Sequence, residues 1–187
     1  KNYLKEIQKE CLVNCWGDIL LNLIKIKDKK NVKKITVNID KSSYLTSLIH
    51  FLQIYKSFKK ININSKYKLN INKIINSKRR NYKELEGKLE IFKKDFIFIY
   101  QSSKQNTAFS INFYFKKFVL TANLLNNFKV EIINKRKKKL INFPLTSHTS
   151  TNLIKAIYYG KKIDLPRYQD ISQINKFIII NTFCYFI

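Results

Sequence analysis

The stretch "FSINFYFKKFVL", residues Phe109 to Leu120, predicts the fold class of this chain. Within it the apolar Ile111 and Phe113 alternate with the polar Asn112 and Tyr114. A period of two residues is typical of a strand with one face on a core and the other face in water. Antiparallel sheets commonly have one buried and one solvated face, so we expect antiparallel strands here.

Helical and strand patterns precede this stretch. From Tyr3 to Leu23 apolar residues recur every three or four positions, which predicts an amphipathic opening helix. "KKITVNI", Lys33 to Ile39, alternates as a strand does, and a helix is expected over Leu45 to Tyr55, followed by a strand at "KKININ", Lys59 to Asn64. The sequence therefore predicts an α+β fold, with a mainly antiparallel sheet and helices packed on one face.

The remaining segments are assigned from their loss or gain of periodicity. Residues 66–88 carry many charges without a clear period and predict an exposed basic loop, whereas residues 89–133 contain several strand-like runs. The apolar tail, residues 177–187, is too short to span a bilayer and predicts a terminal strand. We expect one domain over residues 1–187, with a basic insertion around residues 66–151.

The charge of the chain indicates a polyanionic partner. Lysine and arginine number 37 against 12 acidic residues, a formal net charge of +25. Such a charge opposes compaction unless a polyanion neutralises it, and the cations here are interleaved with Asn, Tyr and Phe rather than gathered on one amphipathic helix. This pattern favours nucleic acid over a membrane surface as the partner.

The densest charge block is "NKRKKKL", Asn134 to Leu140, which is either a solvated hairpin tip or loop or a phosphate-binding segment. The charge of the whole chain favours the second interpretation. Cations in loops and at strand ends are expected to contact RNA phosphates without reading bases. Those predicted to do so are Lys33, Lys34, Lys59, Lys60, Lys66, Arg79, Arg80, Lys135, Arg136, Lys137, Lys138 and Lys139.

Catalytic and metal-binding patterns are not expected. Ser147 and His148 are adjacent, so their side chains diverge and cannot form a nucleophile–base pair. With three glycines in the chain, a glycine-rich phosphate loop or nucleophile elbow is not expected. Cys11 and Cys15 are four residues apart and read as one face of a buried helix, without companion metal ligands. The sequence thus predicts no enzyme, no metal and no cofactor.

Four segments resemble a known family in their order: "NYLKEIQKECLVNCWGDILLN", "KNVKKITVNI", "LIHFLQIYKSFKKININSK" and "LPRYQDI". They are similar to the opening helix, first strand, following helix with second strand, and terminal signature of the large-subunit ribosomal protein L-five family. The middle of the chain does not match, and "DKSS", residues 40–43, stands where that family commonly has a glycine-rich loop.

The resemblance implies a non-catalytic constituent of the large ribosomal subunit, seated on rRNA in the central protuberance. It implies contacts with 5S rRNA where that RNA exists, otherwise with large-subunit rRNA, and with neighbouring ribosomal proteins, the small-subunit head and P-site tRNA. It also implies that Pro166 ends a helix and that "LPRYQDI" leads through a loop to later strands. Arg167 would then be available to bind RNA or to pair with Asp170.

Two other inferences complete the sequence-based hypothesis. The dominance of Lys, Asn, Ile and Phe is what A/T-rich codons produce, and it favours a mitochondrial location, with a plastid as the alternative; no targeting segment is recognised. The alternatives in function are a small-subunit protein of the S-ten family, suggested by "SH" in a basic loop before "KKIDL", and a basic membrane-surface or DNA-associated structural protein.

Overall fold

The computed structural model describes residues 16–40, 44–61, 64–76, 83–92, 94–100, 107–125, 127–144, 151, 154–155, 158–160 and 168–182. Its helices are α2 (Trp16–Ile24), the short 3-10 helix η1 (Lys29–Asn31), α3 (Tyr44–Lys56) and α5 (Tyr168–Thr182). Its strands are β1 (Lys34–Ile39), β2 (Tyr67–Asn76), β3 (Lys83–Ile91), β4 (Phe96–Tyr100), β5 (Thr107–Tyr114), β6 (Val119–Leu125), β7 (Lys129–Asn134) and β8 (Lys137–Asn142).

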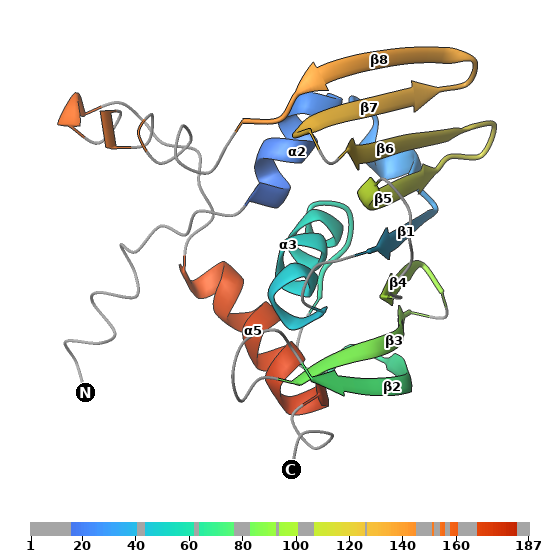
Figure 1. Cartoon of the computed structure of the whole chain (residues 1–187), viewed down its shortest axis with the longest axis vertical. Helices are drawn as coiled ribbons and strands as arrows, with labels where there is room; N and C mark the ends of the chain where they lie inside the picture. The colour runs from blue at the N-terminus through green and yellow to red at the C-terminus, as the bar shows by residue number, and fades with distance from the viewer. Residues whose placement is uncertain are drawn as a thin grey trace.

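The strands form one eight-stranded sheet in the order β2-β3-β4-β1-β5-β6-β7-β8. Within it β1 and β4 run parallel, and every other neighbouring pair is antiparallel. Figure 1 shows α2, α3 and α5 on one side of this curved sheet, with α2 beside β7 and β8 and α5 beside β2 and β3. The predicted α+β fold with a mainly antiparallel sheet and helices on one face is confirmed.

The core lies between α3 and the centre of the sheet. Phe51 of α3 is fully buried and contacts Phe98 of β4 and Phe109 of β5, at ring-centroid distances of 5.8 and 5.1 Å. Phe109 occupies a helix-facing position of β5, where apolar and polar residues alternate, whereas β4 is apolar along its length. The sequence pattern around Phe109 therefore predicts correctly which side chains enter the core.

The opposite face of the sheet is polar. Thr121 donates a hydrogen bond to Asn112 Oδ1 at 2.7 Å, and Asn112 Nδ2 donates to Thr36 Oγ1 at 3.3 Å. These side chains come from β6, β5 and β1, so they form a ladder across three adjacent strands. A polar ladder satisfies its own hydrogen-bonding groups without a covering layer of helices.

Several turns are tight although they lack glycine. Non-glycine residues with a left-handed backbone are Lys25, Phe92, Lys94, Phe128 and Lys135. Each of these positions favours glycine or asparagine, so a lysine or phenylalanine there costs of order 1 kcal/mol.

Some predicted elements are confirmed. The strand expected at Lys33 to Ile39 is β1, the helix expected at Leu45 to Tyr55 is α3, and the strand-like runs in residues 89–133 fall within β3 to β7. The described part of the opening helix is α2; residues 1–15, with Cys11 and Cys15, lie outside the described residues. No helix in the described part of the chain is long and apolar enough to cross a membrane.

Two predictions between residues 59 and 88 are wrong. The strand expected at Lys59 to Asn64 is not one in its described residues, and the next strand, β2, begins at Tyr67. The basic loop expected at residues 66–88 is instead the hairpin of β2 and β3. The hairpin was missed because β2 is an edge strand and mostly exposed, so its sequence shows no clear apolar face.

The prediction of a terminal strand is also wrong, because Phe177 to Thr182 belong to α5. A run of β-branched residues favours a strand locally, but Ile171, Ile174 and Phe177 are buried at helical spacing. The loop that the ribosomal resemblance placed after "LPRYQDI" is likewise absent, since α5 begins at Tyr168 within that phrase. Tertiary packing of one helical face overrides the local strand preference.

Candidate anion-binding site

The densest charge block of the sequence forms the hairpin of β7 and β8. The two strands are paired from Lys129↔Asn142 to Asn134↔Lys137, which leaves Lys135 and Arg136 as the turn. The loop interpretation of the block is therefore correct only for these two turn residues, because the next three lysines belong to β8. A strand sends successive side chains to opposite faces, so the block is divided between the two faces of the sheet.

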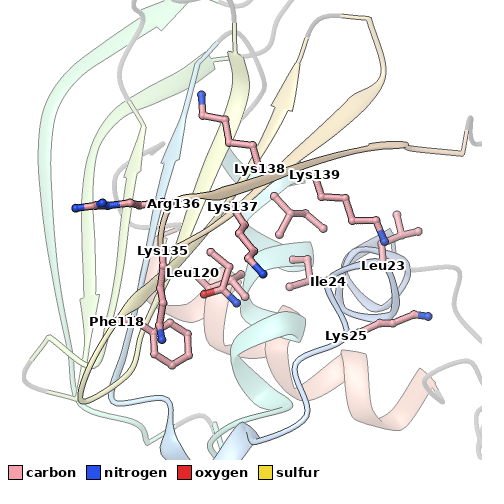
Figure 2. Close-up of a pocket in the computed structure, with 12 residues that line it drawn as sticks. Leu23, Ile24, Lys25, Phe118, Leu120, Lys135, Arg136, Lys137, Lys138 and Lys139 are labelled. Carbon is pink, nitrogen blue, oxygen red and sulfur yellow. The ribbon is translucent and has the colours of Figure 1, made fainter.

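The division is visible in the contacts of the strand. Lys139 pairs with Ile132, a buried residue on the helix side of the sheet, whereas Lys138 makes an ion pair of 3.6 Å with Glu131 on the other face. Figure 2 shows the side chains of Lys137 and Lys139 directed toward α2, and those of Arg136 and Lys138 directed elsewhere.

A cavity of about 1120 Å³ lies on the helix side of this hairpin. Its walls come from the last turn of α2 and the residue after it, the start of β6, and the β7–β8 hairpin (Figure 2). The lining residues are Leu23, Ile24, Lys25, Phe118, Leu120, Ile132, Asn134, Lys135, Arg136, Lys137, Lys138 and Lys139. A cavity of this size can hold a ligand of nucleotide size or larger.

The lining combines an apolar floor with cationic walls. Ile24 and Leu120 are 7% exposed and Ile132 is 9% exposed, so the floor is built from core residues. Lysines from α2's end and from the hairpin stand around it, and no lining residue is acidic. Within the described ranges, the ammonium groups of Lys25, Lys137 and Lys139 have no ion-pair partner.

Lys135 and Phe118 form one corner of the cavity. The ammonium group of Lys135 lies 5.9 Å from the centroid of the Phe118 ring, a cation–π distance. The same ring stacks on Phe115, with centroids 4.4 Å apart and an interplanar angle of 10°, and packs against the hydrophobic core. Phe118 is therefore a fixed support for Lys135.

The other predicted cations lie elsewhere. Lys34 is in β1 with its ammonium group 5.3 Å from the Tyr114 ring, Lys59 pairs with Asp95, and Lys60 and Lys66 are exposed in the connection between α3 and β2. Lys33 precedes β1 and donates its backbone N–H to Tyr114 O. Arg79, Arg80 and Arg167 lie outside the described residues. Of the predicted cations, the structure brings together those of residues 135–139.

Sequence reasoning missed the α2 part of the cavity. Lys25 follows the last turn of α2 with a left-handed backbone, φ 54°, and the expected helix ended at Leu23. A lysine just after a helical apolar pattern is a helix-end signal that identifies its position. That the end of α2 meets the β7–β8 hairpin depends on tertiary contacts.

Candidate proton-transfer groups do not line the cavity. Burial lowers the pKa of His50 to about 4, so this imidazole is neutral at pH 7. Burial and then the charge of Asp95 raise the pKa of the Tyr55 hydroxyl, which has no hydrogen-bond partner within the described residues. Both belong to α3, and the described residues contain no group of three or more potential metal ligands. The cationic lining at the hairpin is suited to bind an anion.

No protein-family model and no curated protein matches this sequence. Solved structures do match in fold. A super-repressor mutant of Gal80p from Saccharomyces cerevisiae has a TM-score of 0.56 at 9% identity, over 95% of this chain and 61% of that one. A mutant of KijD10, a 3-ketoreductase from Actinomadura kijaniata solved with TDP-benzene and NADP, has a TM-score of 0.54 at 10% identity, over 94% and 61%.

A third match is an oxidoreductase from Agrobacterium radiobacter solved with NAD+, L-tartaric acid and magnesium, with a TM-score of 0.50 at 9% identity, over 90% of this chain and 58% of that one. KijD10 and the protein from Agrobacterium radiobacter are thus a ketoreductase and an oxidoreductase. At these identities the likeness establishes the fold alone. This chain spans about three fifths of the length of the structures it matches.

The resemblance to the ribosomal L-five family is wrong, and with it the expected function in a ribosome, because the solved structures that share the fold are oxidoreductases and a repressor. The expected partners, rRNA, 5S rRNA, ribosomal proteins and tRNA, are corrected on the same ground. The quoted segments share only a helix–strand–helix order, which many α+β domains have. The expectation that the chain is not an enzyme conflicts with the predominance of oxidoreductases among the matches. The mitochondrial location stays a prediction.

Nicotinamide dinucleotides, present in two of these structures, do not fit the described residues here. A dinucleotide-binding turn follows a strand and uses glycines, so that the backbone approaches the pyrophosphate. Among the described elements, β1 is followed directly by the helix α3, and the residues between them are Asp40, Lys41, Ser42 and Ser43, none of which is glycine. The buried carboxyl group of Asp40 at the end of β1 also opposes a pyrophosphate electrostatically.

Proposed function

We propose that this chain forms a substrate-side domain of an NAD(P)-dependent oxidoreductase. The observation that carries the proposal is the fold shared with KijD10 over 94% of this chain. The fold shared with the oxidoreductase from Agrobacterium radiobacter supports it as well. The domain would hold substrate rather than cofactor, because the connection from β1 to α3 has no glycine-rich turn.

A second function is favoured by the similarity to Gal80p and by the positions of His50 and Tyr55, which leave the cavity without a proton-transfer group. In this alternative the chain belongs to a regulator that binds a ligand without converting it. The same fold supports both roles, since function depends on the site that a fold carries.

Kinetic and binding measurements separate the two functions. The protein expressed from its complete gene should be assayed for oxidation of NADH and NADPH with a panel of keto sugars and nucleotide-linked keto sugars. Turnover supports the oxidoreductase. Binding of a dinucleotide without turnover, followed by equilibrium dialysis, supports the regulator. A protein that neither binds NAD(P)H nor oxidises it contradicts both.

A further inference from the structure

The cavity gathers several lysines around one space that has no acidic residue in its lining, whereas some lysines elsewhere on the described surface have acidic partners. Lys59 pairs with Asp95, and Lys88 pairs with Glu90. On the two faces of β8 the same contrast appears, because Lys138 pairs with Glu131 whereas Lys137 and Lys139 face a cavity without acidic residues. Cations that share one cavity repel each other, and a multivalent anion removes this repulsion on binding.

The apolar floor of the cavity indicates that the ligand has an apolar portion in addition to its anionic group. Ile24, Leu120 and Ile132 belong to the hydrophobic core and yet border the cavity. A purely inorganic anion would leave this apolar surface in contact with water. A ligand with a hydrocarbon or ring portion would cover it, and burial of apolar area contributes about 25 cal/mol per Å².

A structural explanation for the lysines of β8 also exists. β8 is an edge strand, and lysines on an edge discourage pairing with another chain. That explanation accounts for charge anywhere on the edge. It does not account for Lys25, which approaches from the end of α2, or for the support of Lys135 by Phe118.

We propose that the cavity between α2 and the β7–β8 hairpin binds an organic diphosphate, with the diphosphate among Lys25, Lys135, Lys137 and Lys139 and the apolar portion on the Ile24–Leu120–Ile132 floor. The ammonium groups would bind the phosphate oxygens as point charges. A nucleoside diphosphate and an isoprenoid diphosphate share this chemistry. The inference concerns binding and holds whether or not the protein reduces a substrate.

Isothermal titration calorimetry on the full chain tests the ligand class. ADP, geranyl diphosphate and inorganic pyrophosphate are titrated at one fixed ionic strength, because the net charge of the chain attracts any anion. We expect at least one organic diphosphate to bind about tenfold or more tightly than pyrophosphate, as a well-covered apolar floor implies. The tighter binder of ADP and geranyl diphosphate identifies the ligand as a nucleoside diphosphate or an isoprenoid diphosphate. Equal binding of all three, or no binding, overturns the proposal.

Two exposed lysines of η1, Lys29 and Lys30, supply a matched control outside the lining of the cavity. Lys137→Gln with Lys139→Gln removes two charges that face the cavity, and Lys29→Gln with Lys30→Gln removes two that do not line it. Both variants lower the net charge by the same amount. We expect the first to weaken the organic diphosphate by about tenfold or more and the second by about twofold or less.

Equal weakening in the two variants would show binding by the diffuse field of the chain and overturn the proposal. Circular dichroism and thermal melts verify that both variants fold. Should the cavity-facing double variant unfold, the single variants Lys137→Gln and Lys139→Gln are each compared with Lys30→Gln. A single cavity-facing change that weakens binding no more than Lys30→Gln also overturns the proposal.

Discussion

The two edge hairpins of the sheet have similar lysine-rich sequences and different surroundings. In the β2–β3 hairpin, Lys68 lies opposite Glu90 and Lys73 lies opposite Glu86, so charges alternate across the strands. In the β7–β8 hairpin Glu131 is the acidic residue, and it faces away from the cavity. Similar composition thus gives a neutralised edge in one place and an uncompensated cationic cavity in the other.

The helices covering the two edges differ as well. On the β2–β3 side, Phe177 of α5 is 1% exposed and packs edge-on against Tyr67 at 5.6 Å. On the β7–β8 side, the last turn of α2 borders the cavity. The β2–β3 edge of the sheet is covered by the packed helix α5, whereas the β7–β8 edge has a cavity beside α2. The β7–β8 edge therefore has space for a ligand.

The largest expected effect tests the packing of α5 on the β2–β3 edge of the sheet. Phe177→Ala should lower the free energy of unfolding by about 3 to 5 kcal/mol, because it leaves a cavity under α5. Ile24→Ala at the β7–β8 edge should cost less, about 2 kcal/mol, because its site already borders a cavity. Urea denaturation measures both. Ile179→Ala in α5, at an exposed position, is the control and should change stability by less than about 0.5 kcal/mol. A larger loss for Ile24→Ala would contradict the comparison.

The second effect concerns pH and the attachment of α2 at the β7–β8 edge. His50 of α3 lies against Trp16 of α2, with ring centroids 4.6 Å apart. Its folded pKa is about 4 and its ordinary value is 6.5, so below pH 6.5 the unfolded chain takes up a proton that the folded chain does not. Stability should therefore fall between pH 6.5 and about 4, by up to about 3 kcal/mol.

The variant His50→Phe keeps an aromatic ring beside Trp16 and cannot titrate. Its stability should depend less on pH over the same window, as measured by urea titrations at a series of pH values. Identical pH profiles for the variant and the parent would show that this imidazole does not set the acid sensitivity of the α2–α3 contact.

The third effect concerns Gly17, where the backbone of α2 packs closely against α3. A Cβ added at Gly17 would lie 2.5 Å from His50 O and 3.0 Å from Ile54 Cγ1. Gly17→Ala should destabilise the protein by about 1 to 3 kcal/mol, although alanine is the better helix former. Because the displacement would move α2 against the β7–β8 hairpin, diphosphate binding should weaken as well. Asn22→Ala, at an exposed site of α2, is the control and should not destabilise. A stabilised Gly17→Ala variant would contradict this account of the crossing.

The smallest effect has opposite signs at the two edges. Lys88→Gln removes the partner that lowers the pKa of Glu90 through a side-chain hydrogen bond, and it should decrease stability slightly. Lys137→Gln relieves repulsion and should increase stability, each change amounting to a few tenths of a kcal/mol at low salt. Melting temperatures at low and high salt measure the difference, which should shrink as salt screens both effects. The same sign for both variants would show that the two edges are electrostatically alike.

Particular residues show how far the sequence predicts the fold. The alternation around Phe109 identified core positions, and helical spacing identified α3. The β3 strand carries a regular pattern at Leu85, Leu89 and Ile91, but the predicted strand-like region began at Leu89, so its first half was assigned to a basic loop because of its charges. β2 is different, since an exposed edge strand needs no apolar face and leaves no period to detect.

The candidate site was predictable only in part. The charge of residues 134–140 predicts that the block binds an anion, and half of the residues that line the cavity come from it. Which of its lysines face the cavity follows from the register Lys139↔Ile132, and a shift of one residue would exchange the two sets. The ribosomal hypothesis was wrong because charge indicates an anionic partner without identifying it.

The sequence by itself determined the α+β class, the alternation of core and solvent residues in the central strands, and the excess of positive charge. These are local properties, fixed by side-chain period and composition. Tertiary structure alone decided that Tyr168–Thr182 form a helix, that α2 ends beside β8, and that Lys137 and Lys139 share a cavity with Lys25. Such outcomes depend on contacts between residues far apart in the chain, whose free energy no local pattern contains.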